Sequence, residues 1–270
     1  MKQLTKIKNE LIDRSLDDVR ERFHAVAITY DIEPDVIPSG SAALDQAMGC
    51  GGYPKRHIVE LFGPPGSGKT TLAMVAAANV NRAGGTVIYV DAERAFNRSY
   101  ARQLGVAVDD NHLFLCFTPD CGEQAFDTIE EVMRTAAIDL VVVDSIAALV
   151  PREELETSFC ARQSRFLHAT MVNAGIRRLV SLFSKTNTCG IFINQLRQIP
   201  DAPRGSGETT TGGNGIKNHA AIRIDLREEG VQMEGDRCVG INVAATIVKN
   251  NQSAPFARAR FGILFSHGLN

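Results

Sequence analysis

Hydrophobic and polar positions follow two different periods between residues 58 and 195. Short, almost continuous apolar runs are separated by stretches in which apolar residues recur at helical spacing. Such runs are typical of strands buried on both faces, so the pattern predicts an α/β fold with a doubly wound, mostly parallel sheet. The predicted strands are 58–62, 86–91, 140–144 and 190–195, and the predicted helices are 70–81, one around 125–133 and one near 163–183.

The pattern changes after Asn214, where strand candidates follow one another without helices between them. These candidates are 221–227, 239–248 and 256–265, joined by short polar turns such as Glu228–Gly230. We expect them to extend the sheet with largely antiparallel neighbours. The stretch 196–213 is rich in Pro, Gly, Ser and Thr and is predicted to be a long functional or mobile loop.

The first 35 residues have a pattern of their own. Apolar residues recur at helical spacing among charged ones up to Phe23, and a strand-like run follows at 25–30. Periodicity leaves two interpretations open, a helix packed on its own domain or an arm packed on another subunit. We therefore divide the chain into an N-terminal helix and strand arm, 1–35, and one core domain, 36–270.

Charge and cysteine content narrow the possible partners and location. With 29 Lys and Arg against 31 Asp and Glu, the net charge is −2, so any nucleic-acid site must be local. The 6 cysteines form neither a C-x-x-C pair nor a zinc pattern, which indicates reduced, mostly buried thiols. No run is long enough to span a membrane and no export signal is evident, so we expect a soluble, cytoplasmic protein.

A phosphate-binding motif lies between a predicted strand and a predicted helix. The segment Gly63–Thr70 reads GPPGSGKT and satisfies the pattern G-x-x-x-x-G-K-[ST]. Backbone N–H groups of such a loop surround the β-phosphate of ATP, and the helix N-terminus faces the same anion. Lys69 would add positive charge at the β- and γ-phosphates, and the Thr70 hydroxyl would bind Mg²⁺.

Two acidic residues follow other predicted strands. Asp144 ends the apolar run 141–143 and is expected to hold the water shell of Mg²⁺, although such a residue can also cap a helix. Glu93 follows the strand that ends at Asp91, on the edge of the sheet that faces ligands. It is a candidate to polarise the attacking water, and the alternative is an exposed acid favoured by a helix dipole.

A series of short motifs runs from about residue 36 onward. They are VIPSGS at 36–41, GGYP at 51–54, the phosphate loop, DAE at 91–93, VDSIAAL at 143–149, FINQ at 192–195, ETTTGGN at 208–214 and VKN at 248–250. In these motifs and in their order, the chain resembles bacterial RecA recombinases, and the segment 208–214 resembles the second DNA-binding loop of that family.

The resemblance implies a DNA-dependent ATPase that forms helical filaments on single-stranded DNA. It would pair this DNA with a homologous duplex and promote strand exchange, in DNA repair and the SOS response. Glu93 matches the catalytic glutamate, Gln195 the sensor of the γ-phosphate, and Lys249 a lysine that reaches the neighbouring subunit's γ-phosphate. The implied contacts to ATP are Gly63, Pro64, Pro65, Gly66, Ser67, Gly68, Lys69, Thr70, Thr71, Tyr100, which stacks on adenine, and Asp144.

The DNA-binding candidates come partly from the resemblance and partly from chemistry. Glycines permit close approach to phosphates, Asn214 is able to cap the helix that follows it, and basic side chains supply charge. Each arginine taken alone is as consistent with a solvated surface charge. The candidates are Arg162, Arg165, Arg177, Arg197, Arg204, Gly212, Gly213, Asn214 and Lys217.

The chain also departs from the family pattern. Asn251 stands where a second interface lysine is usual, and an amide carries no charge to offset the developing anion, so slower ATP turnover is expected. The first DNA loop, 152–165, has an unusual sequence, and Asn218 and His219 replace an aromatic pair. Bacterial RecA continues beyond the position of Asn270 into a small domain, which suggests a minimal phage-like recombinase, a divergent paralogue or a truncation.

Two further functions are weighed against the recombinase. A RecA-fold accessory protein could use ATP to hold a DNA-repair partner without strand exchange, and the unusual first loop and Asn251 are compatible with it. The near-complete second loop, Gln195, Glu93 and Lys249 favour the recombinase. A hexameric motor such as a helicase is not supported by the segment 208–214.

Overall fold

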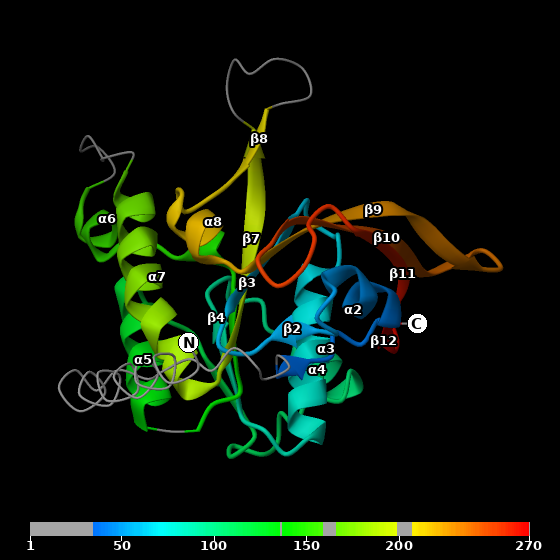
Figure 1. The fold of residues 1–270 in the computed structure, drawn as a ribbon, viewed down its shortest axis with the longest axis horizontal. Helices are drawn as coiled ribbons and strands as arrows, with labels where there is room; N and C mark the ends of the chain where they lie inside the picture. The colour runs from blue at the N-terminus through cyan, green and yellow to red at the C-terminus, as the bar shows by residue number, and fades with distance from the viewer. Residues whose placement is uncertain (1–34, 136, 159–165, 199–206, 270) are drawn as a thin grey trace, which may run out of the picture. The chain divides into compact units, whose positions relative to one another are not determined.

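The computed structural model describes residues 35–135, 137–158, 166–198 and 207–269 (Figure 1). The residues from Asp35 onward form one compact unit. The predicted N-terminal helix and the strand-like run at 25–30 lie outside the described residues. So does Cys160.

The core of the protein is a 10-stranded sheet with two kinds of neighbours. Six strands, in the order β9-β3-β7-β6-β4-β5, are parallel, and β10, β11 and β12 continue the sheet antiparallel from β9. The predicted α/β fold class is confirmed. The parallel strands are β3 (Ile58–Gly63), β4 (Val87–Asp91), β5 (Phe114–Phe117), β6 (Leu140–Asp144), β7 (Cys189–Gln198) and β9 (Ile222–Glu234). The antiparallel strands are β10 (Arg237–Asn250), β11 (Arg258–Leu264) and β12 (Gly268–Leu269).

Helices cover both faces of the sheet because alternate strand residues point to opposite sides. Leu140 and Val142 pack with α2 (Ala42–Met48), α3 (Lys69–Arg82) and α4 (Arg98–Gln103), whereas Val141 and Val143 pack with α5 (Gly122–Thr135), α7 (Leu167–Thr186) and α8 (Gly215–His219). Figure 1 shows α3 and α5 on these opposite faces. The remaining elements are the pair β1 (Val36–Ile37) and β2 (Tyr53–Pro54), a 3₁₀ helix η1 (Ile146–Ala148), α6 (Arg152–Glu156) and β8 (Glu208–Thr210).

One predicted turn is wrong. Glu228–Gly230 lies inside β9, which continues to Glu234, and the chain reverses around Gly235, at φ 60°. The register between β9 and β10 shifts beside Gly230, whose φ is 148°. A β-bulge therefore accommodates the glycine that resembles a turn signal in the sequence.

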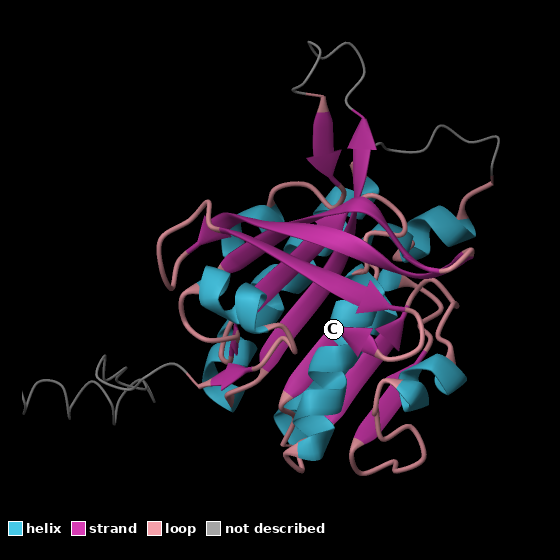
Figure 2. Ribbon diagram, turned by 90° about the vertical axis from the view of Figure 1, so that its right-hand side faces the viewer, coloured by secondary structure: helices cyan, strands magenta, loops and turns pink. Residues whose placement is uncertain are grey.

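The predicted loop at 196–213 is also partly wrong, because its two ends are strands. β8 pairs antiparallel with the end of β7, with Arg197 opposite Thr209. Figures 1 and 2 show this pair extending beyond the rest of the sheet. The DNA candidate Arg197 thus lies on a stem that begins in the core of the sheet, and Gly212, Gly213 and Asn214 follow the second strand of this stem.

Two sequence expectations concern the surface. The cysteines are not mostly buried among the described residues: Cys121 and Cys189 are buried, Cys50 is partly buried, and Cys116 and Cys238 are exposed. An apolar run shows only that a strand exists, not which of its faces is covered. Within the described ranges, no helix has both the length and the apolar character needed to cross a membrane.

Candidate functional site

The phosphate loop joins the end of β3 to the start of α3. The Lys69 ammonium donates to the carbonyl oxygens of Gly63, at 3.0 Å, and Pro64, at 2.6 Å, so it lies folded over its own loop. Gly68 has φ 85°, and a Cβ there would lie 2.2 Å from Ile263 Cδ1 of β11. A side chain there would have to displace the end of the Ile263 side chain, and the positive φ favours glycine in its own right.

Thr70 and Asp144 come together at the ends of α3 and β6. The Thr70 hydroxyl donates to Asp144 Oδ2 at 2.7 Å, and the Tyr89 hydroxyl donates to the same oxygen at 2.7 Å. Hydroxyl and carboxylate oxygens suit Mg²⁺, which keeps several waters and needs few protein ligands. The described residues contain no cluster of three or more His, Cys, Asp or Glu that could hold a metal. The pair fits a metal shared with phosphate oxygens.

Glu93 lies beside this pair because the turn after β4 is tied to β6. The Glu93 N–H donates to the Asp144 carbonyl oxygen at 3.2 Å, and the Asp91 carboxylate accepts from the N–H groups of Ala95 and Phe96. Glu93 Oε1 accepts hydrogen bonds from Ser145 Oγ, at 2.5 Å, and Gln195 Nε2, at 2.8 Å. Glu93, the candidate catalytic residue, and Gln195, the candidate γ-phosphate sensor, are thus joined by a direct hydrogen bond.

Burial changes the proton affinity of two groups in this site. It lowers the pKa of Lys69, although the nearby Asp144 and Glu93 carboxylates oppose the shift. It raises the pKa of Asp144, although hydrogen bonds from Tyr89 and Thr70 oppose that shift. Both directions follow from the cost of holding a charge away from water. Bound anionic phosphates and a cation would offset this cost for both groups.

Tyr100 lies on α4, close to the first turn of α3. Its hydroxyl is 3.1 Å from Thr71 Oγ1, and its ring is partly buried. The remaining predicted ATP contacts lie in the loop and are Pro65, Gly66 and Ser67. Ser67 Oγ donates to the Pro64 carbonyl oxygen at 2.9 Å, and a Cβ on Gly66 would meet no atom within 4 Å. The predicted ATP residues therefore lie on the loop, on the start of α3, on α4 and at the end of β6.

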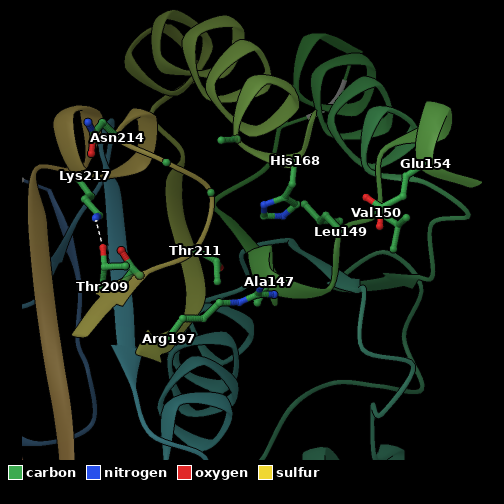
Figure 3. A pocket seen from close by; sticks show the side chains of 14 residues that line it. Ala147, Leu149, Val150, Glu154, His168, Arg197, Thr209, Thr211, Asn214 and Lys217 are labelled. Carbon is green, nitrogen blue, oxygen red and sulfur yellow. Dashed lines mark hydrogen bonds between the residues drawn. The ribbon is translucent and has the colours of Figure 1, made fainter. Parts of the chain in front are cut away.

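A second site is a cavity of about 510 Å³ between the β7–β8 stem and α7 (Figure 3). Lys217 Nζ donates to Thr209 Oγ1 at 2.6 Å across one side of it. Burial lowers the pKa of Lys217. The structure brings together five of the predicted DNA residues in the lining of this cavity. These are Arg197, Gly212, Gly213, Asn214 and Lys217.

The other DNA candidates are not brought into this cavity. Arg177 is exposed on α7, where its Nε donates to the Asn173 carbonyl oxygen at 3.3 Å, and it does not line the cavity. Arg162, Arg165 and Arg204 lie outside the described residues.

The predicted cap at Asn214 is wrong. Asn214 occupies the N-cap position of α8, but its side chain makes no capping hydrogen bond. The Gly215 N–H instead donates to Asn173 Oδ1 at 2.6 Å. A side chain from α7 therefore satisfies this helix end, which local sequence alone does not reveal.

The interface candidates lie near the end of β10. Lys249 Nζ donates to the carbonyl oxygens of Lys217, at 3.0 Å, and Asn218, at 2.7 Å. Burial lowers the pKa of Lys249, and nearby Arg223 acts in the same direction. Asn251 is exposed and its N–H donates to the Ala221 carbonyl oxygen. Lys249 thus connects β10 to the helix that follows the DNA loop.

Comparison with known proteins identifies the family. The profile described as RecA N-terminal domain matches residues 12–270. Protein RecA of Porphyromonas gingivalis is 44% identical over 235 residues, covering 87% of this chain and 68% of that protein. The chain belongs to the RecA family. Protein RecA of Azospirillum lipoferum is 45% identical over 269 residues, covering 97% of this chain and 74% of that protein, and that of Thermus thermophilus is 44% identical over 237 residues.

Membership of the RecA family confirms the predicted function. The protein is an ATP-dependent recombinase and a DNA-dependent ATPase, and nothing in the comparisons favours the accessory-protein alternative. The predicted link to DNA recombination and repair is confirmed with it.

Some residues at the two sites were missed by sequence reasoning. Ser145 and Tyr89 bind the carboxylates of Glu93 and Asp144, and His168 lines the cavity with its Nε2 2.9 Å from the Ile146 carbonyl oxygen. Ser145 directly follows Asp144, so its position offered a signal. Tyr89 and His168 offered no such signal, because Tyr89 lies within a predicted apolar strand and His168 within a predicted helix.

Proposed function

We propose that the protein binds ATP and Mg²⁺ between subunits of a helical filament on single-stranded DNA, and that ATP controls its affinity for DNA. The observation that carries this proposal is the hydrogen bond from Gln195 Nε2 to Glu93 Oε1 at 2.8 Å. Gln195 lies on β7, which continues into the β7–β8 stem beside the cavity. One side chain therefore joins the hydrolytic carboxylate to the DNA-facing loop.

In this proposal the residues of the chain have separate roles at the ATP site. The loop N–H groups and Lys69 hold the phosphates, Tyr100 stacks on adenine, and Thr70 and Asp144 hold the metal, Asp144 through water. When bound, Mg²⁺ neutralises charge on the phosphate oxygens. Glu93 orients the attacking water. The hydrogen bonds from Ser145 and Gln195 both go to Oε1, so loss of the bond from Gln195 would leave Oε1 as well as the second carboxylate oxygen able to accept from water.

The γ-phosphate offers Gln195 an alternative partner. When its amide donates to a phosphate oxygen rather than to Glu93, the carboxylate becomes available to water and the end of β7 shifts. This exchange would link ATP occupancy to the position of the DNA loop, and thermodynamic linkage makes the effect reciprocal.

We propose that the cavity lined by Arg197 and Lys217 receives the backbone of single-stranded DNA and, later, a homologous duplex. This is supported by two basic side chains and by the N–H groups around Gly212 and Gly213, which suit phosphate. Among the described residues, no Phe, Tyr or Trp side chain lines the cavity, so we expect contacts to phosphate to dominate and sequence preference to be weak.

Filament assembly would complete the ATP site from a second copy of the chain. We propose that Lys249 and Asn251 face the neighbour's γ-phosphate and that the N-terminal arm takes part in assembly. Because the proposed substrate is DNA, we propose that the protein is located in the cytoplasm.

The decisive experiment measures ATP hydrolysis with and without single-stranded DNA, together with strand exchange between homologous DNAs. We expect DNA to stimulate hydrolysis and strand exchange to require ATP. Lys69→Ala serves as the control that lacks the phosphate contact. Hydrolysis that is indifferent to DNA would contradict the proposed coupling, and ATP binding without strand exchange would point to the accessory-protein alternative.

A further inference from the structure

A buried polar network lies between the ATP site and the DNA-facing cavity. At its centre is Glu60, in the middle of β3, with none of its surface exposed. Its carboxylate accepts hydrogen bonds from Asn194 Nδ2, at 2.8 Å, and from Arg223 Nε. A buried charge is costly unless it is paired and hydrogen-bonded. Glu60 therefore holds both partners against β3, three positions before the phosphate loop.

Asn194 uses every hydrogen-bonding position of its side chain. Its Nδ2 also donates to the Thr211 carbonyl oxygen at 3.0 Å. Its Oδ1 accepts from the Gln195 N–H, at 2.9 Å, and from Thr211 Oγ1, at 2.5 Å. An amide has two N–H donors and two acceptor positions, so no capacity remains. Asn194 thus joins β3, the sensor Gln195 and the base of the DNA loop.

Arg223 extends the network in two further directions. Its Nη2 donates to Thr210 Oγ1 at 3.3 Å, and its guanidinium lies 4.8 Å from the centre of the Phe62 ring. Lys249 is its partner in the pairing of β9 with β10. The Glu60 carboxylate is therefore connected to the strand that carries the interface lysine as well as to the DNA loop.

We infer that Glu60 and Asn194 are positioning residues that couple the γ-phosphate sensor to the DNA loop. Breaking any one link leaves a buried donor or acceptor without a partner, so the linked residues move as one body. A shift of Gln195 toward phosphate then moves Thr211 and the two glycines that follow it. This inference rests on the proposed function, because it assigns the residues that connect the ATP site to the DNA-facing cavity.

The test is a swap of charge between the two residues in the full chain. In Glu60→Gln, the oxygen of the new amide can accept from either Arg223 or Asn194. Its NH₂ group then faces the N–H donors of whichever of these two residues the oxygen does not contact. In the double variant Glu60→Gln/Asn194→Asp, the Gln oxygen accepts from Arg223 and its NH₂ group donates to the new carboxylate. The single variant weakens the link between residues 60 and 194. The double variant restores that link and the charge, but it removes the N–H group that donates to the Thr211 carbonyl oxygen, so the network is cut from the DNA loop.

The measured quantity is the gain in affinity for a non-hydrolysable ATP analogue on addition of oligodeoxythymidylate. We expect Glu60→Gln to reduce this gain about 10-fold, within the usual range of coupling between sites. Its affinity for the analogue without DNA is expected to stay at the wild-type value. The double variant is expected to show a similar reduction, because it restores the pairing at residue 60 but loses the hydrogen bond to Thr211.

Thr188→Val is the matched control for loss of a buried hydrogen bond. Thr188 is fully buried just before β7, at the end opposite Asn194, and its Oγ1 donates to the Ile138 carbonyl oxygen at 2.7 Å. We expect this variant to lower the melting temperature and to leave the DNA-induced gain unchanged. If Thr188→Val also lost the DNA-induced gain in affinity for the ATP analogue, general loosening of the core would explain the loss in Glu60→Gln.

The outcomes separate this inference from the proposed function. No gain on DNA addition in the wild type would overturn the proposed function itself. A wild-type gain that persists in Glu60→Gln or in a folded double variant would overturn only the inference. If Glu60→Gln does not fold, the double variant decides alone.

Discussion

The ATP site and the DNA-facing cavity are built in different ways. The ATP site is centred on one continuous segment, Gly63–Thr71, and its cation Lys69 is buried and bonded within that segment. The cavity is assembled from the segment after β6 and from α6, α7, β7, β8 and α8, and Arg197 is exposed there (Figure 3). A preformed loop suits one compact anion, whereas exposed cations suit a long polyanion with many weak contacts.

This difference indicates how each site responds to substitution. Removing one buried group from the preformed loop removes a contact for which there is no substitute. Removing one exposed cation from the cavity leaves its other contacts in place. The four predictions below test this contrast.

The largest effect is expected for Lys69→Ala. The loop loses the only cation that it contributes to the phosphates, and ATP hydrolysis should fall by about 1000-fold, as for loss of a strong transition-state contact. A radiometric assay of phosphate release measures this. The far-ultraviolet circular dichroism spectrum should be unchanged, and retention of more than a tenth of the wild-type rate would contradict the assigned role.

Glu93→Gln is expected to slow hydrolysis by about 100-fold while ATP still binds, because an amide orients water poorly and accepts no proton. Fluorescence titration with a labelled ATP analogue gives the affinity, and phosphate release gives the rate. A parallel loss of affinity and rate would show that Glu93 supports binding instead. Glu123→Gln, a substitution on α5, is the matched control.

Arg197→Ala is expected to weaken single-stranded DNA binding about fivefold without changing ATP affinity. Loss of one phosphate contact should reduce the slope of log affinity against log salt by about 0.7. Fluorescence anisotropy at several salt concentrations measures both quantities. Arg98→Ala removes an exposed arginine that pairs with Asp109, and it should leave the slope unchanged. Equal slopes of log affinity against log salt for Arg197→Ala and Arg98→Ala would show that Arg197 does not contact DNA.

The smallest effect is expected for Asn251→Lys. A lysine near the neighbour's γ-phosphate would add charge opposite the developing anion and raise DNA-stimulated turnover about threefold, less than for a preformed buried donor. Steady-state hydrolysis on saturating DNA measures it. An unchanged rate would count against a position at the neighbour's nucleotide. Asn251→Gln keeps the amide and is the control for side-chain length.

Much of the fold could be predicted because its signals are local. The apolar runs correspond to β3, β4, β6 and β7. Of the strands after Asn214, β9 pairs parallel with β3, and β10, β11 and β12 continue the sheet antiparallel, so the prediction of largely antiparallel neighbours is confirmed except at β9. The errors occurred where two signals compete. Gly230 has the character of a turn residue, but pairing with β10 keeps it in a strand. Asn214 occupies a cap position, but Asn173 from α7 supplies the hydrogen bond.

The sequence by itself determined the phosphate loop, four of the six parallel strands and the residues that carry the family resemblance. Each of these depends on neighbours within a few positions, whose spacing sets backbone geometry directly. Only the tertiary structure decided that Gln195 binds Glu93, 102 positions away, and that Asn194 binds Glu60, 134 positions away. Such contacts arise from the order in which strands pair, and hydrophobic periodicity carries no information about that order.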